Sequence, residues 1–294
     1  MILISSNILN ISFLRLIKPK NQSLGTPGPL PAFEPLQVDD YNDPEEPNIP
    51  PSLNRHNPLA LFRLFFTNQM VDKMVEWTNK YAELHRPLEE KCPKGKERPW
   101  KPASRRELYV YFALVIFMRI TIEPTIEDYW GSLEISGTEH KLSRYISCNR
   151  FQQIDRYGRC TTPWEDDDGM LNTTFNWVDE LSEHLRILCR RYYKPGCHLA
   201  VDETIERFMG RAPKIVNIPS KPTPEGFKIW VLANQGYVLD WLWQAKGDNK
   251  GPVDLDTAFL DEGFSKTQAV VLDFLTQMDP ETNSHLYPPN RHVV

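Results

Sequence analysis

Apolar side chains recur at helical spacing in the first part of the chain after residue 57. The segment "LALFRLFFTNQMVDKMVEWTNKYAEL" places apolar residues three or four positions apart over residues 61–77. A second, strongly apolar run, "ELYVYFALVIFMRI", follows Ser104, a residue type that often caps the start of a helix. A third helix is predicted over about residues 175–193. Such stripes are typical of a packed core, so we expect a helical scaffold.

The spacing of apolar residues changes after residue 196. "HLAVDETIERF" and "GFKIWVLAN" are typical of strands, and Asn234-Gln235-Gly236 is short enough to turn the second strand into "YVLDWLWQAKG" as a hairpin. "SKTQAVVLDFLTQM" returns to helical spacing, and "HVV" at residues 292–294 predicts the first residues of another strand. The order predicts an α+β or α/β protein in which a helical region precedes a sheet layer.

A segment rich in proline and acidic residues precedes these elements. Residues 19–51 contain many prolines, which deny the backbone both helix and ladder hydrogen bonds. We therefore divide the chain into a disordered leader over residues 1–56, a helical region over residues 57–195 and a sheet region over residues 196–294.

Composition limits the classes of protein that remain. The chain has 294 residues, of which 40% are hydrophobic, and a formal net charge of −5, which argues against a generally basic, DNA-coating protein. Its five cysteines are scattered, which predicts neither a disulfide framework nor a zinc site. We find no signal peptide, and no stretch of about 18 apolar residues predicts a membrane span.

The stretch "HLAVDETIERFMGR" ends an apolar run at Asp202 and soon reaches positive charge at Arg211. An aspartate at the exit of a central strand can join other carboxylates in holding a pair of divalent metal ions for phosphoryl transfer. Aspartate is also common at strand ends and turns, so both interpretations remain open at this point.

Four separated motifs resemble the piggyBac transposase family: "NPLALFRLFFTNQMVDKMVEWTN", "RFQQIDRYGR", "HLAVDETIERFMGRAP" and "IPSKPTPEGFKIWVLAN". The resemblance covers residues 57–294. It implies a ribonuclease H-like core of three strands, a helix and a fourth strand, preceded by a helical region that helps to bind DNA and to dimerise. It also implies Mg²⁺ as cofactor, transposon ends and TTAA-like sites as DNA partners, and a location in the nucleus. Asp202 corresponds to the first catalytic aspartate and metal ligand.

Four basic residues lie close to the strand of Asp202 in the sequence, and they are expected either to contact DNA phosphates or to be ordinary surface charge. Arg211 and Lys221 are favoured for phosphate contact because they lie in the matching motifs. We expect Glu203 and Glu206 to be plain surface carboxylates, and "WEDDDG" at residues 164–169 to be a solvated turn. The four basic candidates are Arg211, Lys214, Lys221 and Lys228.

The carboxylates that would complete the family's metal site are not recognisable in this sequence. The family's second aspartate lies in a segment resembling "D-N-x-F-T-S", and this sequence reaches only "NRHVV" where that strand would begin. The family's third aspartate, further on, is not found either, and Asp240 and Asp273 match neither of these two motifs. We therefore expect a truncated, catalytically inert chain with an unpaired sheet edge. The alternatives are a domesticated, non-enzymatic DNA-binding or protein-interaction module and a nonfunctional pseudogene product.

Overall fold

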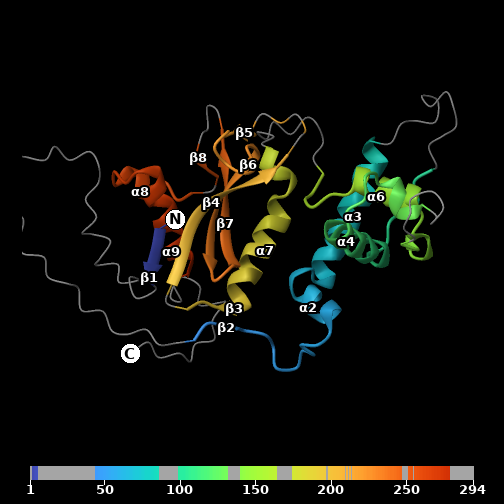
Figure 1. Ribbon diagram of the computed structural model, residues 1–294, viewed down its shortest axis with the longest axis horizontal. Helices are drawn as coiled ribbons and strands as arrows, with labels where there is room; N and C mark the ends of the chain where they lie inside the picture. The colour runs from blue at the N-terminus through green and yellow to red at the C-terminus, as the bar shows by residue number, and fades with distance from the viewer. Residues whose placement is uncertain are drawn as a thin grey trace, which may run out of the picture. The chain divides into compact units, whose positions relative to one another are not determined.

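The computed structural model describes residues 2–5, 44–85, 99–131, 140–163, 174–196, 198–208, 210, 212, 214–246, 251–253 and 255–278. The chain forms two compact units (Figure 1). One is a helical unit, Asn54–Glu183, and the other is a sheet unit made of Met1–Leu53 and His184–Val294. No helix in the described ranges is both long enough and apolar enough to cross a membrane.

The helical unit begins with two helices that the sequence pattern predicts as one. Asn57 caps the first helix by accepting hydrogen bonds from the backbone N–H groups of Leu59 and Ala60. The helix ends before Thr67, whose hydroxyl accepts a hydrogen bond from the N–H of Met70 and starts the next helix. The α-helices of this unit are α2 (Pro58–Phe65), α3 (Asn68–His85), α4 (Arg105–Ile120) and α6 (Cys148–Tyr157), with the short 3₁₀ helices η3 (Glu127–Trp130), η4 (Leu142–Arg144) and η5 (Thr174–Trp177).

A single hydrophobic core joins α3, α4 and α6. Val71 of α3 and Ile154 of α6 are almost completely buried, at 0% and 1% exposure. Burying side chains of this size contributes about 1.5–3 kcal/mol each, so the core can hold the three helices together. Its other buried members are Met70, Met74, Trp77, Ala103, Leu108, Leu114, Tyr129, Leu142, Ile146 and Phe151.

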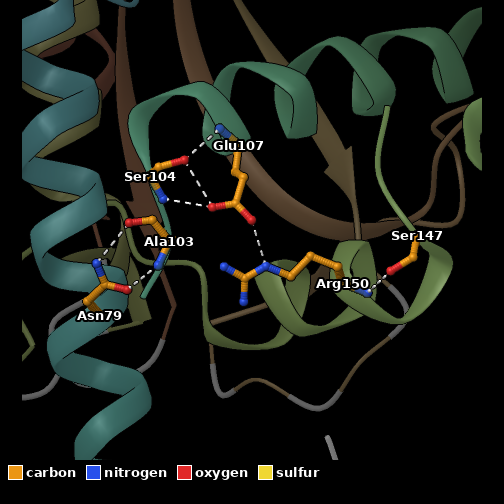
Figure 2. A network of polar contacts seen from close by, with 6 residues as sticks. All are labelled: Asn79, Ala103, Ser104, Glu107, Ser147 and Arg150. Carbon is orange, nitrogen blue, oxygen red and sulfur yellow. Dashed lines mark hydrogen bonds and ion pairs between the residues drawn. The ribbon is translucent and has the colours of Figure 1, made fainter. Parts of the chain in front are cut away.

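A polar network ties the starts of α4 and α6 together, as Figure 2 shows. Ser104 forms a capping box with Glu107, whose second carboxylate oxygen accepts a hydrogen bond from Arg150 Nε at 2.9 Å. Asn79 of α3 exchanges two hydrogen bonds with the backbone of Ala103. Burial alone would raise the pKa of Glu107, but the hydrogen bonds from Arg150 and Ser104 outweigh it and lower the pKa.

The sheet unit is antiparallel throughout its described pairs. Its strand order is β1-β4-β6-β7-β8, with β5 pairing beside β6 (Figure 1). Gln235 and Gly236 both have positive φ, at 46° and 87°, as a two-residue hairpin turn between β6 and β7 requires. The strands are β1 (Ile2–Ser5), β4 (His198–Arg207), β5 (Val216–Asn217), β6 (Glu225–Asn234), β7 (Tyr237–Ala245) and β8 (Gly251–Pro252); β2 (Glu46–Pro47) pairs with β3 (Tyr193–Lys194) as a separate ribbon.

One face of the sheet packs against a helix. Leu199 and Val201 of β4 and Leu232 of β6 lie in the same buried cluster as Val270 and Phe274 of α9 (Lys266–Met278). The charged helix α7 (Asp179–Arg191) is joined to β7 by buried ion pairs, and α8 (Ala258–Asp261) is a single turn before α9. The period-two alternation of the strands leaves the opposite face of β4 exposed.

The predicted order of three long strands followed by a helix is confirmed, and so is the mixed helix and sheet class. The sequence pattern does not predict α6, and it predicts residues 175–193 as one helix where the structure has η5 and then α7. Within the predicted leader, the structure describes β1 and β2; β1 pairs with β4, and β2 pairs with β3. "HVV" at residues 292–294 lies outside the described residues, as does all of "WEDDDG" at residues 164–169.

Candidate catalytic site

Asp202 is the fifth of ten residues in β4, on the exposed face of the strand. It pairs with Val231 of β6, and the pairing continues from Ala200 to Arg207. We expect from the sequence that Asp202 ends a strand and is partly buried, but the structure places it in mid-strand and exposed. The difference arises because the ladder to β6 carries the strand five residues past Asp202.

Within the described ranges, no ion pair neutralises the Asp202 carboxylate. Its Oδ1 accepts a hydrogen bond from the backbone N–H of Glu203 at 2.8 Å, which is a local contact to the next residue. The ion pairs found within the described ranges do not include Asp202. Asp202 can therefore offer carboxylate oxygen to an external cation.

Glu203 points to the opposite face of β4 and is held by two lysines. Its carboxylate forms an ion pair with Lys228 of β6 and another with Lys221 at 3.3 Å. The hydrogen bond from Lys228 lowers the pKa of Glu203, against a smaller opposing effect of burial. Lys228 Nζ also lies over the ring of Trp230, 4.9 Å from its centroid. Glu203 is thus the centre of a charged cluster and not a plain surface carboxylate.

The structure brings together two of the four predicted phosphate-contacting residues. Lys221 and Lys228 meet at Glu203, whereas Lys214 Nζ donates to the backbone carbonyl of Lys246 at 3.0 Å. Arg211 lies outside the described residues. Lys221, whose side chain is 36% exposed, is more accessible than Lys228 at 19%.

A buried charge network that the sequence does not predict lies at the interface of β7 and α7. Asp240 is completely buried and accepts hydrogen bonds from Arg186 Nε at 2.5 Å and from Arg190 Nη1. Asp273 of α9 is also buried, and desolvation is the main cause that raises its pKa to about 6. The spacing of Arg186 and Arg190, four residues apart on one helix, is the sequence signal that could have indicated a shared partner.

The carboxylates of the two faces cannot form one metal centre. Asp240 shares the packed face of the sheet with Val201, whereas Asp202 lies on the exposed face. Across the ranges that the structure describes, no group of three or more His, Cys, Asp or Glu side chains could hold a metal ion. Asp202 is therefore a single potential ligand within the described part of the protein.

Comparison with known proteins places the chain in a family. A family model described as Transposase IS4 matches residues 57–293. The chain is also similar to a piggyBac transposase, in a cryo-EM structure of its synaptic complex with hairpin DNA, with a TM-score of 0.51 and 24% sequence identity. That likeness covers 74% of this chain and 44% of the other, so this chain spans less than half of that transposase. At 24% identity, the likeness shows a shared fold. The family match covers most of the chain, and the resemblance found in its motifs is confirmed: the protein belongs to the Transposase IS4 family and is a piggyBac-like, DDE transposase-derived protein.

Proposed function

We propose that this protein descends from an enzyme that cuts and rejoins DNA, and that Asp202 is the first metal-binding carboxylate of its catalytic core. The observation that carries the proposal is the exposed position of Asp202 on β4, within the region matched by the transposase family. Asp240, on β7 two strands away in the sheet, is buried and neutralised by two arginines. Asp202 has no such counter-charge in the described ranges, which suits a carboxylate that meets a metal ion.

The family implies a divalent metal ion, and we propose Mg²⁺, which prefers oxygen ligands. Such ions, held by several carboxylates, activate the nucleophile and stabilise the leaving oxygen in phosphoryl transfer. Asp202 fits as one of these ligands, but the described residues do not complete a site. We therefore assign no reaction step to the described residues alone, and we propose that the polypeptide of residues 1–294 does not cleave DNA by itself.

A nicking assay tests both parts of this proposal. Labelled duplex carrying a terminal repeat is incubated with the 294-residue chain and Mg²⁺ or Mn²⁺, and we expect no metal-dependent cleavage. Cleavage would show that the chain is active. A longer chain that carries further carboxylates is expected to cleave, and Asp202→Asn should abolish that cleavage, whereas Asp261→Asn, on an exposed turn of α8, should not. An Asp202→Asn version that still cleaves would rule out the metal-ligand role.

DNA is the partner that we propose for both units. The similar piggyBac transposase binds hairpin DNA in its synaptic complex, and the resemblance in sequence adds transposon ends and TTAA-like target sites. We propose binding that is mostly independent of sequence, together with a homodimer and a location in the nucleus. Footprinting tests the independence of sequence, and a sharply protected sequence would contradict it. Light scattering of the purified chain tests the homodimer, and a monomer at all concentrations would contradict it. Imaging of a tagged protein tests the location, and a cytoplasmic signal would contradict it.

A second candidate function is a domesticated, non-enzymatic DNA-binding or protein-interaction module. It is favoured by the helical unit, Asn54–Glu183, which has its own hydrophobic core and its own polar network. Salt-sensitive DNA binding by the full chain, without nicking by any extended version, would support this function over the catalytic one.

A further inference from the structure

The two predicted phosphate-contacting lysines that the structure describes together are both engaged by one carboxylate. Glu203 forms ion pairs with Lys221 and Lys228, and it lies near the middle of the β4–β6 pair, opposite Trp230. Two ammonium groups against one carboxylate leave this cluster with one net positive charge. We call Glu203, Lys221 and Lys228 the Glu203 triad.

The members of the Glu203 triad differ in how firmly they are held. Lys228 is the more buried lysine, with a side chain 19% exposed, and it also lies over Trp230. Lys221 is 36% exposed and stands 3.3 Å from the Glu203 carboxylate. It follows a tight turn in which its backbone N–H donates to the carbonyl of Ile218. Lys221 is therefore the member that an approaching anion meets first.

We propose that Glu203 competes with DNA phosphates for Lys221, and so sets the strength with which the sheet unit holds a DNA backbone. This inference rests on the proposed DNA-binding function. A phosphate that contacts Lys221 has to draw this ammonium group away from the Glu203 carboxylate. Lys228 assists by neutralising that carboxylate, so it acts as a positioning residue and not as a phosphate contact. The Lys221–Glu203 pair is partly exposed, at 36% and 26%, and ion pairs near the surface are weak enough to be exchanged for a phosphate.

The net charge of the triad predicts an order of affinities among variants. Glu203→Gln raises the local charge by one, and Lys221→Gln and Lys228→Gln each lower it to zero. The double variant Glu203→Gln/Lys228→Gln restores the wild-type value. Because each phosphate contact adds about 0.9 to the slope of log affinity against log salt concentration, each step should be visible in that slope.

The test is fluorescence anisotropy of the full chain with an arbitrary-sequence duplex of about 20 base pairs, between about 50 and 200 mM salt. We expect Glu203→Gln to bind about threefold to tenfold more tightly with a steeper slope, and either lysine variant to bind more weakly with a shallower one. The double variant should return to the wild-type slope. Glu262→Gln at the end of α8 makes the same change in total charge away from the triad and should have no effect. Thermal melts establish that each variant is folded.

Three results overturn the inference. If the wild type binds DNA and folded Glu203→Gln binds with the same affinity and slope, the triad is structural and only this inference fails. If Glu262→Gln tightens binding as much as Glu203→Gln, the effect comes from total charge and not from the triad. If neither the wild type nor any variant binds duplex at about 50 mM salt, the proposed DNA-binding function fails together with the inference. If Glu203→Gln alone does not fold, the double variant is compared with Lys228→Gln instead, and an equal slope for these two variants overturns the inference.

Discussion

Replacing Asp240 by asparagine tests the division of the sheet into a packed, charge-paired face and an exposed face. The Asp240 carboxylate is 0% exposed and accepts hydrogen bonds from Arg186 and Arg190, whose side chains are 12% and 4% exposed. Asparagine keeps the shape of the side chain but removes the charge. Its amide group also presents a donor where the structure has guanidinium donors.

The expected loss follows from the two arginines that would stay behind. Removing one partner of a buried ion pair costs about 3–5 kcal/mol, because the remaining charge is left uncompensated away from water. Asp273 offsets part of this cost. The negative charge of Asp240 helps to raise the pKa of Asp273, so without it Asp273 ionises more readily, and the Asp273 carboxylate lies near Arg186. We expect Asp240→Asn to destabilise the protein by about 3–5 kcal/mol.

Asp202→Asn is the matched control, because it makes the same chemical change on β4 of the same sheet. Asp202 is exposed and makes a single local hydrogen bond, so we expect a change within about 0.5 kcal/mol. Urea unfolding measures both variants, and a loss of 4 kcal/mol at an m-value of about 2–3 kcal/mol/M lowers the midpoint by more than about 1 M. Hydrogen exchange of β7 peptides localises the effect to the sheet unit.

The reasoning is refuted if Asp240→Asn costs less than about 1 kcal/mol, because the charges would then not be buried and interdependent. It is also refuted if Asp202→Asn costs as much as Asp240→Asn. That result would mean that Asp202 caps or pairs within the fold, and it would remove the main support for its role as a metal ligand.

Three further predictions concern other parts of the fold. Burial raises the pKa of Asp273 from 3.8 to about 6, so the contribution of protonated Asp273 to folding stability is present below about pH 4 and is lost as the pH rises to 6. Asp273→Asn should therefore stabilise the protein by up to about 3 kcal/mol at pH 7 and by almost nothing at pH 4. Urea titrations across that pH range measure the difference. A Cβ at Gly226 would lie 2.0 Å from the carbonyl oxygen of Glu206. Gly226→Ala should therefore lower the free energy of unfolding by more than about 2 kcal/mol and speed hydrogen exchange in β4 and β6. A loss below about 0.5 kcal/mol would contradict the register of these strands. Ser104→Ala removes the cap of α4 and should lower the free energy of unfolding by about 1 kcal/mol. Thermal unfolding followed by circular dichroism measures this loss. A variant as stable as the wild type would show that Glu107 alone holds this helix end.

Elements with a complete local signal could be predicted from the sequence, and those that depend on long-range partners could not. The β6–β7 hairpin has two short runs rich in β-branched and aromatic residues and a short turn ending in Gly236, so local sequence predicts both its strands and its connection. Helix α6 has only a few apolar residues, among them Phe151 and Ile154, within a polar run, and Ser147 at its N-cap is the signal that could have revealed it.

The candidate site was predictable in part for the same reason. Alternation along a strand is a local property, so the sequence alone places Asp202 and Glu203 on opposite faces. The lysines on Glu203 and the arginines on Asp240 come from elsewhere in the chain, and Arg190 is 50 residues from Asp240. Sequence spacing cannot reveal that such residues meet, because register and helix packing decide it.

The geometry of β4 restricts where further ligands for a metal ion at Asp202 can come from. Glu203 is adjacent but faces the other side, where the two lysines of the triad hold it. Glu206 shares the exposed face, yet four residues along a strand correspond to about 13 Å, which is too far for both carboxylates to bind one ion. The cross-strand neighbour of Asp202 is Val231, which has no ligand atom in its side chain. Further carboxylates must therefore approach from chain outside the described residues or from another molecule, either beside β4 or over its exposed face, and until they do Asp202 should hold Mg²⁺ no more tightly than any exposed carboxylate does.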